Sequence, residues 1–143
     1  MAAIEYLLLA NHVEVQNGLL YVSGGGWANL FRGPLDPDSP PPINHFGIGT
    51  SVLIPWDETN QLHHLVIRVE QENGQELTRI ETDIEVGRPP GLPQGADQRV
   101  AVGFGVNIAF PEEGSYRVVA EVGEDTRRVD FRVFDRSKPQ FLP

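Results

Sequence analysis

Residues 98–110 read QRVAVGFGVNIAF, and the alternation in this stretch decides the fold. Every second residue is large and apolar: Val100, Val102, Phe104, Val106, Ile108 and Phe110. The residues between them are small or polar: Ala101, Gly103, Gly105, Asn107 and Ala109. Side chains of a β-strand point alternately to opposite faces. The stretch therefore predicts a strand with one core face and one face of small residues.

The same period of two extends over the rest of the chain. The expected strands are residues 4–15, 19–22 continued by 27–31 past a break or bulge at Gly24-Gly25-Gly26, 43–54, 63–71, 75–86, 98–110, 115–122 and 126–134. This pattern predicts an all-β fold, a two-sheet antiparallel β-sandwich of immunoglobulin-like or related Greek-key type with about eight strands. A closed barrel is the alternative. We expect a single domain over residues 1–136 and a C-terminal tail over 137–143.

Composition excludes several kinds of function. The chain has 143 residues, a net charge of −9 and no cysteine. Disulfides, thiolate metal sites and cysteine nucleophiles are therefore absent. An acidic chain without clustered basic residues predicts no nucleic-acid partner and no membrane partner. The first residues lack the charged and apolar regions of an export signal, so we expect an acidic protein located in the cytoplasm.

Catalytic signals are weak. Ser23 and Ser51 lie in no Gly-x-Ser-x-Gly elbow, and no Lys-Ser or Lys-Thr pair follows the glycines at 24–26. His63 and His64 are neighbours on an expected strand, so their side chains point to opposite faces and cannot share one metal ion. No catalytic residue and no cofactor is predicted, and we lean against an enzyme.

The segment 111–118, PEEGSYRV, resembles the tyrosine corner of immunoglobulin-like sandwiches. Glu112, Gly114, Tyr116 and Val118 fit that motif, with Val118 where antibody domains have cysteine. In the motif, the tyrosine hydroxyl hydrogen-bonds back to the backbone at a corner between the sheets. The resemblance implies a sandwich and says nothing about binding.

Three further segments make the chain similar to an uncharacterised family of small bacterial β-sandwich proteins. They are LLAN at 8–11 with the Asn17-Gly18 hairpin, IPWDETN at 54–60, and PGLPQG at 90–95. The resemblance implies a bacterial protein, and because no activity is assigned to that family it transfers no catalytic residue.

One end of the expected sandwich collects acidic loops. If every strand crosses the sandwich once, this end carries Asp57, Glu58, Asp97, Glu124 and Asp125. Neighbouring carboxylates could bind Ca²⁺, which prefers six to eight oxygen ligands. A solvated acidic rim is the simpler interpretation, and no Asp-x-Asp-x-Asp-Gly loop supports a metal site.

A surface of small residues suggests a close neighbour. Its predicted members are Leu7, Leu9, Gly47, Gly49, Ala101, Gly103, Gly105 and Ala109. Repeated glycine on a strand face indicates that another element approaches closely. The cover is either a segment of the same chain, such as the loop 33–42, or a second subunit, and we predict a homodimer.

The leading functional hypothesis is a non-catalytic binding or assembly module that self-associates. The alternatives are a metal-dependent module or enzyme at the acidic loop end, or a carrier of small ligands of the carbohydrate type. The carrier would use the aromatic residues Tyr21, Trp27 and Trp56 as stacking surfaces.

Overall fold

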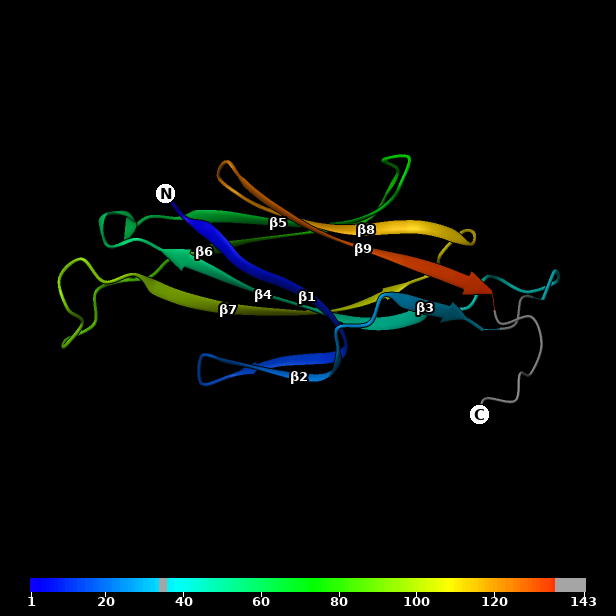
Figure 1. The fold of residues 1–143 in the computed structure, drawn as a ribbon, viewed down its shortest axis with the longest axis horizontal. Helices are drawn as coiled ribbons and strands as arrows, with labels where there is room; N and C mark the ends of the chain where they lie inside the picture. The colour runs from blue at the N-terminus through cyan, green and yellow to red at the C-terminus, as the bar shows by residue number, and fades with distance from the viewer. Residues whose placement is uncertain (34–35, 136–143) are drawn as a thin grey trace.

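The computed structural model describes residues 1–33 and 36–135, and these form two β-sheets that pack face to face (Figure 1). Sheet A has the strand order β2-β1-β4-β7, and sheet B has the order β3-β9-β8-β5-β6. The predicted all-β sandwich is therefore confirmed, with open sheet edges in place of a closed barrel. The expected tail, residues 137–143, lies outside the described residues.

The described residues contain nine strands and one short 3₁₀ helix. They are β1 (Ala3–Gln16), β2 (Leu19–Gly25), β3 (Asn29–Arg32), β4 (Asn44–Ile54), η1 (Trp56–Glu58), β5 (His63–Gln71), β6 (Glu76–Ile84), β7 (Gln98–Ile108), β8 (Gly114–Val122) and β9 (Asp125–Asp135). No helix in this part of the chain is long and apolar enough to cross a membrane.

An aromatic cluster fills one part of the core. It consists of Trp27, Phe46, Phe110, Tyr116 and Phe131, whose contacting ring centroids lie 4.9 to 6.3 Å apart. Phe110 is fully buried, as its alternation predicts. Phe104 is only partly buried against this core. On the same strand, Val106 and Ile108 are buried, so the partial exposure is confined to residues 100–104 of β7.

The predicted facing of Leu7 and Leu9 is wrong. Both side chains contribute to the core between the sheets, where Leu9 is 1% exposed. The cause is a register shift in the pairing of β1 with β4, between Ile4 and Tyr6. A bulge of this kind adds one residue and reverses the alternation that follows it. These two leucines therefore do not belong to the surface of small residues.

The hairpin of β1 and β2 covers part of the small-residue face. The first half of β1 pairs with β4, whereas its second half pairs with β2. Figure 1 shows this hairpin on the side of sheet A that faces away from sheet B. A Cβ atom at Gly47 would lie 2.8 Å from the backbone nitrogen of Val13, and one at Gly49 would lie 2.9 Å from Leu20 Cδ2. These glycines allow a close approach within the chain.

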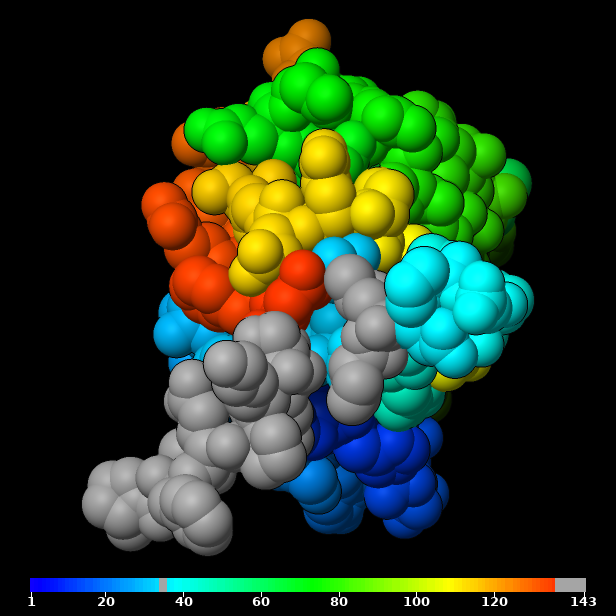
Figure 2. Space-filling view, turned by 90° about the vertical axis from the view of Figure 1, so that its right-hand side faces the viewer, coloured from blue at the N-terminus to red at the C-terminus, as the bar shows by residue number. Residues whose placement is uncertain are grey.

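The loop suggested as the cover lies elsewhere. In Figure 2 residues 36–42, in cyan, stand beside the start of β8, in yellow, whereas the hairpin of β1 and β2, in blue, lies below them. Residues 36–41 of that loop are exposed. Residues 34–35 of the proposed cover lie outside the described residues. The small-residue face is thus covered in part by the same chain, through the hairpin of β1 and β2 and not through the loop 33–42.

The glycines at 24–26 carry the chain from one sheet to the other. Gly24 and Gly26 have φ values of 65° and 87°, a region that glycine adopts without steric cost. We expected the residues beyond these glycines to continue β2. They instead form β3 in sheet B. β3 pairs with β9 in parallel, so the sandwich is not purely antiparallel. Arg32 fixes this pairing, because its Nε donates to Asp135 Oδ1 at 2.5 Å.

The predicted corner at Tyr116 forms the expected hydrogen bond. The Tyr116 hydroxyl donates to the carbonyl oxygen of Glu112 at 2.5 Å, and the side chain is 2% exposed. This contact holds the connection between β7 of sheet A and β8 of sheet B. A motif of eight residues thus correctly predicted one crossing between the sheets.

Candidate functional site

At the acidic loop end, two carboxylates bind backbone groups near the start of β1. Glu58 forms an ion pair with the amino group of Met1, and it also accepts a hydrogen bond from the amide of Ala2 at 3.2 Å. The hydrogen bond from that amino group lowers the pKa of Glu58. Asp125 accepts the amide hydrogen of Ile4 at 2.6 Å. Two of the five candidate carboxylates therefore hold the start of β1.

The structure does not assemble a metal site from the five candidates. Within residues 1–33 and 36–135, no group of three or more histidine, aspartate or glutamate side chains could hold a metal ion. Asp57, Asp97 and Glu124 form no ion pair with another described residue. Three of the five candidates act on one cation, because the hydrogen bond to Glu58 and the charges of Glu58, Asp57 and Asp97 raise the pKa of the Met1 amino group.

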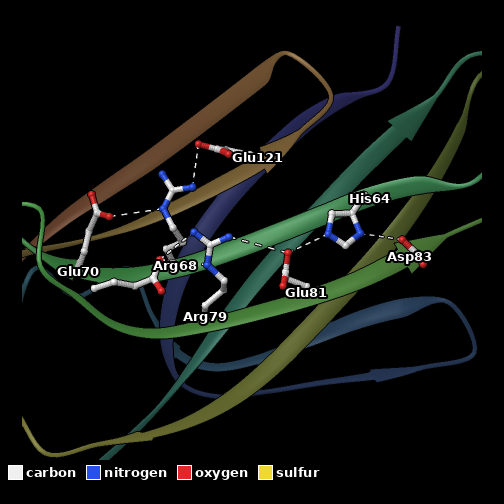
Figure 3. Close-up of polar contacts among 8 residues, drawn as sticks. His64, Arg68, Glu70, Arg79, Glu81, Asp83 and Glu121 are labelled. Atoms are coloured by element: carbon white, nitrogen blue, oxygen red, sulfur yellow. Dashed lines mark hydrogen bonds and ion pairs between the residues drawn. The ribbon is translucent and has the colours of Figure 1, made fainter.

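His64 lies between two carboxylates on the outer face of sheet B. Its Nδ1 is 2.8 Å from Asp83 Oδ1, and its Nε2 is 3.0 Å from Glu81 Oε1 (Figure 3). Hydrogen bonds to Glu81, and then to Asp83, raise the pKa of His64. His63 points the other way, and its Nε2 lies 2.8 Å from the carbonyl oxygen of Glu58. The two histidines diverge, as the strand alternation predicts.

The same face continues as a lattice of paired charges (Figure 3). Arg68 forms ion pairs with Glu121 at 2.9 Å and with Glu70 at 3.5 Å. Glu70 also forms an ion pair with Arg117 at 2.5 Å. Burial acts to raise the pKa of Glu70, but the hydrogen bond and charge of Arg117 outweigh it, and the pKa is lowered. Arg79 pairs with Glu76 at 3.0 Å. Each of these three arginines has a carboxylate partner on the same sheet. This network of ion pairs therefore presents no cluster of unpaired arginines to a ligand.

Both tryptophans are half-buried and contact other residues of the chain. The Arg88 guanidinium carbon lies 4.0 Å from the centroid of the Trp56 ring, and Arg88 also donates to the Trp56 carbonyl oxygen at 2.7 Å. A cation over the ring occupies one of its stacking faces. Trp27 belongs to the core cluster, and Tyr21 is exposed on β2. The three aromatic candidates therefore lie in three different environments.

The free edge of sheet A is the feature with the clearest capacity to bind. β7 pairs with β4 through eleven successive residue pairs without a register shift, and no described residue pairs with its other side. Every second residue of an edge strand directs its amide and carbonyl groups outward. Residues 100–104 are only half-buried. An edge that is long, straight and apolar is a template for strand addition.

The other described edges are short, bent or charged. β3 has four residues, and β2 belongs to the hairpin that folds over the outer face of β4. The outer residues of β6 include Arg79, Glu81 and Asp83, and its pairing with β5 contains a register shift. Charges and bulges are devices that prevent unwanted pairing. β7 lacks both.

Polar side chains on β7 turn away from its free edge. Arg99 reaches back across β4 to Glu5 on β1, with Nε 2.7 Å from Oε2. Asn107 Oδ1 lies 2.9 Å from Nδ1 of His45 on β4. These contacts direct the only charged side chain of β7 away from the side where another strand could pair.

The sequence predicted an interface at other residues: Val100, Val102 and Phe104, which are half-buried at this edge, were expected in the core. Of the candidate interface residues, Ala101, Gly103 and Gly105 lie on β7, and Ala109 follows it. Gly47 and Gly49 are buried on β4. Alternation distinguishes the two faces of a strand, so the sequence predicts an interface on a sheet face. The low charge of 98–108 was the available signal for an edge, but strand order within a sheet is not visible in a single sequence.

Comparisons with known proteins are consistent with this fold. No curated protein has a significant sequence match to the chain. A glycosyl hydrolase family 2 member from Bacteroides cellulosilyticus DSM 14838 is similar in structure, with a TM-score of 0.51 and 10% identity. The match covers 90% of this chain but only 15% of that one, and at this identity it supports the fold alone.

A second structure of a glycosyl hydrolase family 2 member, also from Bacteroides cellulosilyticus, covers 69% of this chain and 13% of its own, with 12% identity and a TM-score of 0.44. The model of a family described as of unknown function, DUF6941, matches residues 5–134. The resemblance to an uncharacterised family is confirmed by that match. Because it spans most of the sequence, the chain belongs to this family of unknown function, DUF6941.

Proposed function

We propose that the protein is a non-catalytic binding and assembly module, which works by strand addition at the edge of β7 and self-associates as a homodimer. The observation that carries the proposal is the length of this edge: eleven residues pair in unbroken register with β4 and with no other strand in residues 1–33 and 36–135. Strand addition supplies main-chain hydrogen bonds over the whole length of a strand, and alternate side chains supply selectivity. The half-buried apolar side chains of residues 100, 102 and 104 would become covered.

The placement of the titratable groups supports a role without catalysis. Glu58 and Asp125 bind backbone groups of β1, and His64 is held between two carboxylates. Groups that stabilise the fold in this way are poorly placed to react with a substrate. The corner at Tyr116 and the two-sheet order also support an immunoglobulin-like arrangement. A bacterial and cytoplasmic setting remains a prediction from the sequence.

The test is the oligomeric state of the intact chain. We expect the wild-type protein to sediment as a dimer at micromolar concentration. Val102→Lys should give a monomer, because a charged residue on an edge strand blocks the addition of another strand. Ile80→Lys is the matched control: it introduces the same charge at a half-buried position on β6, the opposite edge in sheet B. This variant should remain a dimer.

Two results would contradict the proposal. One is a wild-type protein that sediments as a monomer at micromolar concentration. The other is a Val102→Lys protein that retains its secondary structure by circular dichroism and still forms dimers as strongly as Ile80→Lys.

A further inference from the structure

We infer that two copies of the chain pair through β7 in antiparallel orientation, with a two-fold axis at Gly103. The inference rests on the proposed function and specifies its interface residue by residue. A two-fold interface presents the same patch from both copies, so each residue contacts a counterpart fixed by the position of the axis.

The length of the strand places the axis. β7 runs from residue 98 to residue 108, and its midpoint is Gly103. Only an axis at the midpoint lets all eleven residues of one copy pair with all eleven of the other. Any other axis leaves outward amide and carbonyl groups unpaired at both ends of the ladder. Unpaired backbone groups at a buried interface cost free energy, so the full-length register is favoured.

The apolar face is compatible with this register. Val100 of one copy lies opposite Val106 of the other, and Val102 lies opposite Phe104. Each pair joins residues on the core side of the sheet, because alternation is preserved across an antiparallel pair. Pairs of aromatic and β-branched residues stabilise neighbouring strands. The half-buried Val102 and Phe104 would therefore cover each other across the interface.

The outer face is also compatible. In the same register Ala101 lies opposite Gly105, Arg99 lies opposite Asn107, and Gly103 lies opposite its own copy. No like charges meet. The hairpin of the same chain lies over Gly103, since a Cβ atom there would lie 3.2 Å from Val13 Cγ2 and 3.5 Å from both Leu20 Cδ1 and Val15 Cγ2. Of these three side chains, Val15 is 39% exposed. A second copy at this axis would bring the two exposed valines toward each other.

Paired charge variants test the register. Ala101→Lys combined with Gly105→Lys would place lysine opposite lysine at two points, and like charges directly opposite each other destabilise a sheet. Ala101→Lys combined with Gly105→Glu would place opposite charges at the same two points. Gly105 tolerates a side chain, because a Cβ there would contact only the ring of His45. We expect the first protein to be monomeric and the second to be dimeric at the same concentration.

Cross-linking gives a second measurement that does not depend on charge. The native chain contains no cysteine. Ala101→Cys combined with Gly105→Cys should give a covalent dimer under mild oxidation. Each single variant should remain uncross-linked, because the two thiols would lie four residues apart, about 13 Å at the rise of a strand.

The outcomes separate the two levels of the proposal. A wild-type protein that is monomeric at every concentration overturns both the self-association and the register. A dimeric wild type whose two double charge variants associate equally, and whose double cysteine variant does not cross-link, overturns the axis at Gly103. That result leaves strand addition at β7 in another register intact.

Discussion

At the residue scale, His64 links stability to pH. Its raised pKa means that the folded state favours the protonated imidazole, and its contribution is complete below the unfolded pKa, about 6.5. That contribution is lost as pH rises through the raised, folded-state pKa. The same hydrogen bond lowers the pKa of Glu81 below 4.5, so the stability from Glu81 is lost as pH falls through that lowered value. The pair therefore contributes most at mildly acidic pH.

We predict that His64→Gln lowers the free energy of unfolding more at about pH 5.5 than at about pH 8.5. Urea unfolding at the two values measures this difference. His12→Gln is the control, because His12 is exposed and pairs with no described carboxylate. The control should show no such dependence. If both variants respond to pH in the same way, the contacts of His64 do not couple its protonation to folding.

At the element scale, the hairpin of β1 and β2 depends on glycine beneath it. A Cβ at Gly47 would lie 2.8 Å from the backbone nitrogen of Val13, which cannot move without shifting β1. We predict that Gly47→Ala costs about 1–3 kcal/mol of stability, the usual range for overpacking. Denaturant unfolding measures it.

Gly105→Ala is the matched control on the same face. Its Cβ would lie 3.2 Å from Cε1 of the His45 ring, an exposed side chain that can move. Alanine also loses less backbone entropy than glycine on folding. This variant should therefore be neutral or slightly stabilising. Equal losses at both positions would show that the hairpin does not rest on Gly47.

The same elements show how far the sequence could predict the structure. Alternation correctly assigned the core faces of β4, β8 and β9, where large buried side chains recur at every second residue. It failed at Leu7 and Leu9, because one bulge in β1 reverses the facing without changing the composition. Alternation also predicted that the residues of β3 continue β2 as one strand. The left-handed glycines that separate these strands are visible in the sequence, but the sheet that the chain enters next depends on contacts with β9.

The free edge could not be predicted from the sequence, which placed Val100, Val102 and Phe104 in the core and an interface on the small-residue face. The small residues of 98–108 do mark a close approach, but the approaching segment at Gly103 is the hairpin of the same chain. The free edge follows from strand order, and strand order depends on long-range pairing. The acidic loops illustrate the same limit: Glu58 and Asp125 reach the backbone of β1, far from them in sequence.

At the scale of the whole molecule, net charge opposes self-association. Each copy carries −9, so two copies repel each other at long range. The edge of β7 contributes little to this repulsion, because Arg99 is its only charged residue and pairs with Glu5. The proposed contact consists of backbone hydrogen bonds and apolar side chains, which salt does not screen. Salt should therefore weaken the repulsion and leave the attraction unchanged.

We predict that the dimer becomes tighter as sodium chloride is added. The Debye length falls from about 30 Å at 0.01 M to about 10 Å at 0.1 M, so most of the repulsion between two acidic copies is removed within this range. Sedimentation equilibrium at the two concentrations measures the dissociation constant, which should fall. A dimer held by ion pairs, for example between arginines and carboxylates on the outer face of sheet B, would have a dissociation constant that rises with salt. Dissociation on adding salt would therefore place the interface on a charged face and not on the edge of β7.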